Sequence, residues 1–171
     1  PDRTWPLLQN VHGGPHNGVT DAWHWRWNTQ VMASAGYVVA SVNFHGSSSF
    51  GDEFTRSIRG RWGDQPTTDI EAATDHLLAL GSIDPDRMAI AGGSYGGYMA
   101  TWLAGHHGER FRAFCSERAV NNLLSFEPTS DIATAFHAFH GVTQYDDPEL
   151  YERLSPIRAI RDIDTTMLII H

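Results

Sequence analysis

A serine flanked by glycines is the feature of this 171-residue sequence that points most directly to chemistry. Residues 92–97 read Gly-Gly-Ser-Tyr-Gly-Gly and contain the pattern G-x-S-x-G centred on Ser94. When this pattern joins a strand to a helix, the serine lies at a sharp turn and acts as the nucleophile of acyl transfer. So tight a turn needs small residues two positions before and after the serine. The glycines of this candidate nucleophile elbow are Gly92, Gly93, Gly96 and Gly97.

A second motif, His12-Gly13-Gly14-Pro15, follows the first apolar run of the chain. Acyl transfer to a serine needs two hydrogen-bond donors directed at the oxyanion that develops on the carbonyl. One donor is the backbone N–H of the residue after the nucleophile, which is Tyr95 here. The other comes from a loop after an earlier strand, so we expect it to be either the His12 side chain or the Gly13 backbone.

The elements that must position these residues are predicted by apolar runs that alternate with longer helical stretches. This alternation is typical of an α/β fold, with a mostly parallel sheet and flanking helices. The sequence predicts a turn at 82–86. It predicts strands at 7–11, 37–44, 87–91, 111–116 and 165–170, and helices at 21–35, 68–80 and 98–105, with further helical pieces between 131 and 163.

Composition excludes several other functions. The chain has no lysine, which rules out a Schiff-base or phosphate-loop lysine within it, and its net charge of −8 disfavours a nucleic-acid partner. No apolar run approaches the ~20 residues that cross a membrane, so we expect no membrane partner. Cys115 is the only cysteine and needs no oxidising compartment, which favours a cytoplasmic location. His137 and His140 lack a third ligand with suitable spacing, so we expect neither a metal nor an organic cofactor.

The order and spacing of several motifs resemble the catalytic domain of the prolyl oligopeptidase family of serine peptidases, especially its acylaminoacyl-peptidase and dipeptidyl-peptidase branches. The similarity extends over nearly the whole chain and is far more specific than G-x-S-x-G alone. The matching segments are His12-Gly13-Gly14-Pro15, Asn43-Phe44-His45-Gly46-Ser47 with Phe50-Gly51, Trp62-Gly63 before Asp69, Ile83-Asp84-Pro85-Asp86-Arg87, the elbow with Tyr98, Ser155-Pro156-Ile157, and Leu168-Ile169-Ile170-His171.

The resemblance implies an α/β-hydrolase fold, a peptide substrate and Ser94 as the residue that is acylated. It implies that the Tyr95 backbone donates to the oxyanion and that the Tyr95 ring borders the pocket for the residue before the scissile bond. His12 stands where several members of the family carry a tyrosine whose hydroxyl completes the oxyanion hole. No inference about the oligomeric state follows from the sequence.

The order of the catalytic triad in this fold is Ser, then Asp, then His. The resemblance therefore implies that residues 1–171 are a partial catalytic domain, its N-terminal two-thirds. The acid and the base of the triad would lie beyond His171, and a β-propeller domain would precede residue 1. We therefore expect this chain alone to be inactive. A pairing of Asp146 or Asp147 with His171 is disfavoured, because His171 would be held rigidly at a strand end. The alternatives are a carboxylesterase with the same elbow and a non-catalytic, truncated module that binds peptides.

Overall fold

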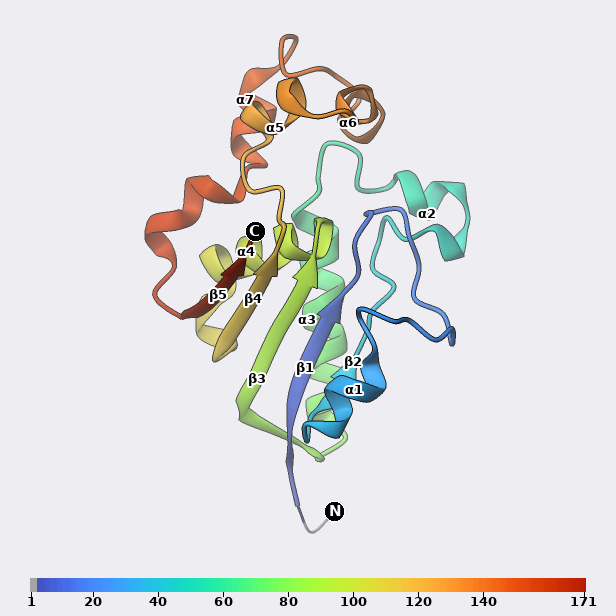
Figure 1. Ribbon diagram of the computed structural model, residues 1–171, viewed down its shortest axis with the longest axis vertical. Helices are drawn as coiled ribbons and strands as arrows, with labels where there is room; N and C mark the ends of the chain where they lie inside the picture. Colours follow the sequence, from blue (N-terminus) through green and yellow to red (C-terminus); the bar gives the residue numbers. More distant parts are fainter. Residues whose placement is uncertain (1–2) are drawn as a thin grey trace.

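Five parallel strands form a sheet in the computed structural model, which describes residues 3–171 (Figure 1). The order is β2-β1-β3-β4-β5, and each neighbouring pair is parallel, so the carboxyl ends of the strands share one edge. This confirms the predicted α/β class. The strands are β1 (Trp5–Val11), β2 (Val38–Ala40), β3 (Ile83–Gly93), β4 (Ala113–Glu117) and β5 (Thr166–Ile170).

Helices cover the sheet and its carboxyl edge. In the view of Figure 1, α1 lies in front of the sheet and α3 and α4 lie behind it, whereas α5, α6 and α7 lie beyond the carboxyl ends of the strands. The helices are α1 (Thr29–Ser34), α2 (Asp52–Arg56), α3 (Asp64–Ala79), α4 (Tyr95–His107), α5 (Leu123–Thr129), α6 (Ala133–His140) and α7 (Pro148–Arg153), with 3₁₀ helices η1 (Ser48–Phe50), η2 (Gly108–Arg110) and η3 (Pro156–Asp162).

The chain changes direction across the sheet at β1. The strand that follows β1 in sequence, β2, pairs on one side of it, and β3 pairs on the other side. A reversal of this kind opens a crevice between the carboxyl ends of the two strands, and ligands of open α/β sheets bind there. Val11 pairs with Gly92 in this register, so the segments that follow β1 and β3 leave the sheet side by side.

Three local predictions were wrong. Residues 21–28 form bends, and α1 begins only at Thr29, after Asn28 caps it by accepting from Gln30 N and Val31 N. The strand predicted at 37–44 is the short β2. The turn expected at 82–86 lies inside β3, where the pairing with β1 shifts between Ile83 and Met88 so that residues 84–87 bulge from the ladder.

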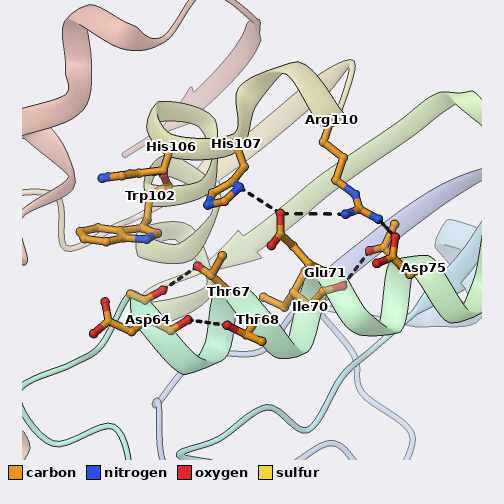
Figure 2. Close-up of polar contacts among 12 residues, drawn as sticks. Asp64, Thr67, Thr68, Ile70, Glu71, Asp75, Trp102, His106, His107 and Arg110 are labelled. Carbon is orange, nitrogen blue, oxygen red and sulfur yellow. Dashed lines mark hydrogen bonds and ion pairs between the residues drawn. The ribbon is translucent and has the colours of Figure 1, made fainter.

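Helix α4 is braced against α3 by polar side chains near its C-terminus (Figure 2). Glu71 of α3 lies 3.0 Å from His107 Nδ1 and faces Arg110, which also pairs with Asp75. At Gly63, the residue before α3, there is no room for a side chain, because a Cβ there would overlap the indole of Trp102 in α4. No helix within residues 3–171 is both long enough and apolar enough to cross a membrane.

Candidate active site

Ser94 lies in the sharp turn between β3 and α4, at the position predicted for it. Its backbone angles are φ 59° and ψ −118°, a conformation that side chains disfavour. The strain persists because the turn is held on both sides: Ser94 N–H donates to the carbonyl of Glu117 at 3.0 Å, and Ser94 C=O accepts from Tyr98 at 2.9 Å. The serine is exposed beyond the carboxyl edge of the sheet, so its hydroxyl is accessible to a ligand.

Close backbone packing explains why glycines surround this serine. A Cβ on Gly92 would overlap the backbone of Gly96, and one on Gly96 would overlap the carbonyl oxygen of Val11. A Cβ on Gly97 would lie 2.6 Å from the carbonyl oxygen of Glu117. Since backbone atoms cannot move aside as a flexible side chain can, the elbow and β1 approach this closely only without side chains at these positions.

Two backbone N–H groups beside Ser94 have no protein acceptor among residues 3–171. They belong to Tyr95, the first residue of α4, and to Gly13, in the loop after β1. The first N–H groups of a helix have no acceptor within the helix. Gly13 is close to the serine, since a Cβ built on Gly13 would lie 3.5 Å from Ser94 Cβ. Both N–H groups therefore remain available to an anion formed next to Ser94.

The imidazole of His12 is already engaged on both of its nitrogens. Nδ1 lies 2.8 Å from the Gly13 carbonyl, which can only accept, so Nδ1 carries the proton and Nε2 accepts from Ser47 Oγ at 2.8 Å. The ring also stacks on Phe44 at 4.2 Å between centroids. Burial lowers the pKa of His12, which keeps the ring neutral near pH 7. The side chain thus supports the loop after β1 and has no free N–H to offer.

The ring of Tyr95 lies in the core rather than in an open pocket. It is 1% exposed, and its hydroxyl donates to the carbonyl of Trp62 at 2.6 Å. It stacks on Tyr98 and contacts the Trp62 ring edge to face. A carbonyl 33 residues away in sequence thus holds the hydroxyl in the core, and the contact of the Tyr95 ring with a substrate stays a prediction.

A cavity of about 520 Å³ opens beside the elbow, next to Gly13 and Gly93. The indole of Trp27 forms part of its wall and lies against Gly93, where a Cβ would come within 3.1 Å of the ring. Asn10 also lines it. Neither Trp27 nor Asn10 was predicted to lie at the site, and Ser47 was named only as part of a matching segment. The alternation of Trp23, Trp25 and Trp27 was the available signal, but it gave no hint that Trp27 lies near Ser94.

Metal ligands do not gather near the elbow. Within residues 3–171, no three side chains of His, Cys, Asp or Glu come together in a way that would hold a metal ion. His140, one of the two histidines considered as ligands, is 5% exposed and packs among Trp62, Phe136 and Tyr151.

Comparison with known proteins gives consistent matches. Residues 23–171 match the model of the prolyl oligopeptidase family. Dipeptidyl-peptidase 5 of Schizosaccharomyces pombe is 37% identical over 172 residues, which cover 99% of this chain and 25% of that protein. An acylaminoacyl peptidase of Pyrococcus horikoshii superposes with a TM-score of 0.90 at 29% identity, over 98% of this chain and 27% of that one. An acylaminoacyl peptidase in complex with Z-Gly-Gly-Phe-chloromethyl ketone gives a TM-score of 0.88 at 29% identity, over 98% and 27% of the two chains. The chain thus spans about a quarter of the length of these relatives.

Proposed function

Because this chain belongs to the prolyl oligopeptidase family, we propose that the whole protein is a serine peptidase that hydrolyses peptide or acyl-peptide bonds through an acyl-enzyme on Ser94. The sheet and its flanking helices are those of an α/β-hydrolase fold. The observation that carries the proposal is the arrangement at the elbow: an exposed serine hydroxyl lies beside two backbone N–H groups that have no acceptor among the described residues. A nucleophile next to an anion site is what acyl transfer requires.

The reaction proposed for this site has two halves. Ser94 Oγ attacks the carbonyl carbon of the scissile bond while a base takes its proton, and the carbonyl oxygen becomes an oxyanion. The C–N bond then breaks, the amine leaves with that proton, and the acyl group stays on Ser94 as an ester. A water molecule, activated by the same base, releases the acid and restores the serine.

The second oxyanion donor in this proposal is the backbone of Gly13 rather than the side chain of His12. Two observations support the choice: the Gly13 N–H has no partner, and both nitrogens of His12 are engaged by Gly13 O and Ser47. His12 then acts indirectly, since its bonds to the Gly13 carbonyl and to Ser47 hold the loop on which the donor lies. The first donor is the N–H of Tyr95.

The general base is proposed to come from outside residues 3–171. No side chain in that range hydrogen-bonds Ser94 Oγ, so nothing described here is in place to take its proton. Residues 1–171 are accordingly proposed to be part of a catalytic domain, with the triad Asp and His in later sequence and a propeller in earlier sequence. The 171-residue chain alone should have negligible activity, because loss of the base costs on the order of 10⁶ in turnover in one well-studied serine peptidase, subtilisin.

Covalent labelling and turnover test this function on the whole protein. We expect a fluorophosphonate to label the protein on Ser94, and Ser94→Ala to abolish both labelling and the release of p-nitroaniline from peptide p-nitroanilides. Turnover that survives Ser94→Ala would contradict the proposal. Purified chain 1–171 is measured in parallel. Ser94-dependent turnover by it would contradict the assignment of the base to another part of the protein.

A substrate panel tests the peptide class against the esterase alternative. The whole protein is offered an N-acyl amino-acid p-nitroanilide, a free dipeptide p-nitroanilide and a short-chain p-nitrophenyl ester. A peptidase should have measurable kcat/KM for one of the anilides, and its preference between the two distinguishes acyl-peptide from dipeptide release. Ester hydrolysis with no anilide hydrolysis would favour a carboxylesterase.

A further inference from the structure

The loop that carries the Gly13 donor is bound along its length to the segment that follows β2. The donor loop is residues 12–19, and the support segment is residues 43–48. Five hydrogen bonds join them: Ser47 Oγ to His12 Nε2 at 2.8 Å, His16 Nδ1 to Gly46 O at 2.8 Å, Ser48 N to Asn17 O at 3.1 Å, Val19 N to Asn43 Oδ1 at 2.7 Å and Asn43 Nδ2 to Val19 O at 3.0 Å. The donor loop contains no helix or strand, so these bonds fix its course.

The bond between Ser47 and His12 lies next to the donor itself. Ser47 is fully buried, and its hydroxyl donates to Nε2 of His12, whose Nδ1 donates to the Gly13 carbonyl at 2.8 Å. The bond to the carbonyl closes a ring of atoms, which runs from the His12 side chain through the planar peptide unit that carries the Gly13 N–H. The direction of this N–H is therefore tied to the orientation of the imidazole, and Ser47 fixes that orientation.

The support segment is anchored in turn to α3 by one carboxylate. Asp69 Oδ2 accepts from the backbone N–H of His45 at 2.6 Å and lies 2.7 Å from His45 Nδ1. An ionised carboxylate can only accept, so the ring proton of His45 lies on Nδ1. Hydrogen bonds to an ionised acceptor are about twice as strong as those between neutral groups. Asp69 precedes Ile70, which is fully buried in the core, so the anchor stands on a part of α3 that is held in place.

A single tight turn connects this anchor to Ser47. The N–H of Ser47 donates to the carbonyl of Phe44 at 2.9 Å, which closes the turn around His45 and Gly46. Gly46 has φ 99°, and a Cβ on it would lie 2.4 Å from Ile58 Cδ1, so the turn is pressed against the core. Because the four residues of the turn are bonded end to end, a displacement of His45 also displaces Ser47.

We propose that Asp69 is a positioning residue of the oxyanion hole, which acts through His45 and Ser47 on the Gly13 donor. This inference rests on the proposed function, because it assumes that the Gly13 N–H stabilises the oxyanion formed next to Ser94. Among residues 3–171 the side chain of Asp69 bonds only His45, so its effect on the reaction is indirect. Without its charge the turn is held less firmly, and the Gly13 N–H is directed less accurately at the developing oxyanion.

The test uses the whole protein and two inhibitors, a peptide aldehyde and the matching peptide alcohol. Ser94 Oγ adds to the aldehyde carbon, and the carbonyl oxygen then occupies the place of the oxyanion, whereas the alcohol binds without forming this bond. The readout is the ratio of the two inhibition constants, aldehyde over alcohol. This ratio reports the oxyanion hole and does not depend on how much of a variant is folded.

Asp69→Asn keeps the shape of the side chain and removes its charge. We expect it to raise the ratio about tenfold and to lower kcat on a peptide p-nitroanilide by a similar factor at nearly constant KM, since complete loss of an oxyanion donor costs about 10²–10³ in kcat. Asp75→Asn is the matched control: it makes the same change in the same helix and also breaks an ion pair, with Arg110. It should leave the ratio within twofold.

Two further variants test the route from Asp69 to the donor. His45→Gln removes the ring bond to Asp69 but keeps the backbone N–H, so it should raise the ratio by less than Asp69→Asn does. Ser47→Ala removes the bond to His12 and should raise the ratio at least tenfold. In the double variant of positions 47 and 69 the effect should be smaller than the product of the two single effects, because both changes act on one pathway.

A ratio that Asp69→Asn and His45→Gln both leave unchanged would overturn the inference, and so would a double variant whose effect equals the product of the single effects. In either case Ser94-dependent turnover would leave the proposed function standing. Turnover that persists in Ser94→Ala would overturn the function and the inference together.

Discussion

The two ends of helix α4 are fixed by opposite means. At its N-terminus, Ser94 is strained and the glycines of the elbow let backbone press against backbone from β1 and β4. At its C-terminus, His107 and the nearby Arg110 reach across to Glu71 through side chains that are 25–37% exposed (Figure 2). The N-terminal, reactive end of α4 thus depends on backbone contacts that any side chain at the glycines would disrupt. The C-terminal end depends on partly exposed polar contacts that water can replace.

The largest expected effect is that of adding one methyl group at the reactive end. Gly96→Ala would drive a Cβ into the carbonyl oxygen of Val11, so β1 or α4 must shift, and we expect a loss of about 3 kcal/mol in the free energy of unfolding. Gly108→Ala at the other end is the matched control. Gly108 has helical angles, φ −61° and ψ −31°, and its added Cβ would lie 3.6 Å from the nearest atom.

Alanine at 108 should therefore be neutral or stabilise the protein by up to about 1 kcal/mol. Chemical denaturation of the two variants of the whole protein measures the difference. Equal losses at positions 96 and 108 would contradict the view that the two ends differ.

Acid should weaken the reactive end through His140. This side chain packs on Trp62, whose carbonyl holds the Tyr95 hydroxyl, and burial lowers the pKa of His140 to about 4. The unfolded chain binds the proton near pH 6.5 and the folded one only near pH 4, so stability is full above about 6.5 and falls as the pH drops toward 4. The loss should reach about 3 kcal/mol, at 1.36 kcal/mol for each pH unit of pKa difference.

The measurement is the free energy of unfolding from pH 7 to pH 4. His140→Phe keeps an aromatic ring among Trp62, Phe136 and Tyr151 and removes the titrating group, so it should flatten the curve in this range. The exposed His106 near the other end of α4 is the matched control, because His106→Phe leaves His140 in place. If the free energy of unfolding of His140→Phe falls as steeply with pH as that of the unaltered protein, His140 is not the group that destabilises the protein in acid.

Because the backbone at Ser94 is strained, glycine should be more stabilising than alanine at this position, the reverse of their usual order within a helix. Alanine at 94 must adopt φ 59° with a Cβ, whereas glycine adopts it without penalty. We expect Ser94→Gly to be about 1 kcal/mol more stable than Ser94→Ala, although neither variant can be acylated. At position 108 alanine should be at least as stable as glycine. If Ser94→Ala proves the more stable variant at 94, strain is not stored at the elbow.

The sequence could predict features that depend on neighbouring residues but not those that depend on distant contacts. The elbow follows from local features, because glycines, a serine, an apolar run and a helical stretch are all contiguous. How the side chains of the site pack, by contrast, depends on partners far away in sequence. The loop before residues 21–28 is held by the bonds of Asn43 to Val19, and His12 Nε2 accepts from Ser47 Oγ. The Tyr95 ring is drawn into the core by Trp62. A local pattern carries no information about such contacts.

The smallest expected effect is at the far end of α4, where Arg110→Gln removes the cation that faces Glu71 and Asp75. Asp75 is 67% exposed and His107 still lies next to Glu71, so water and the remaining pair replace most of the interaction. We expect a loss of about 0.5 kcal/mol in the free energy of unfolding, which shrinks further as salt is added. The rate at which a fluorophosphonate labels Ser94 should stay within twofold, because the elbow is held by backbone contacts that this change does not reach. A loss of more than 2 kcal/mol, or a tenfold slower labelling, would mean that the polar end of α4 positions the nucleophile as strongly as the glycines do.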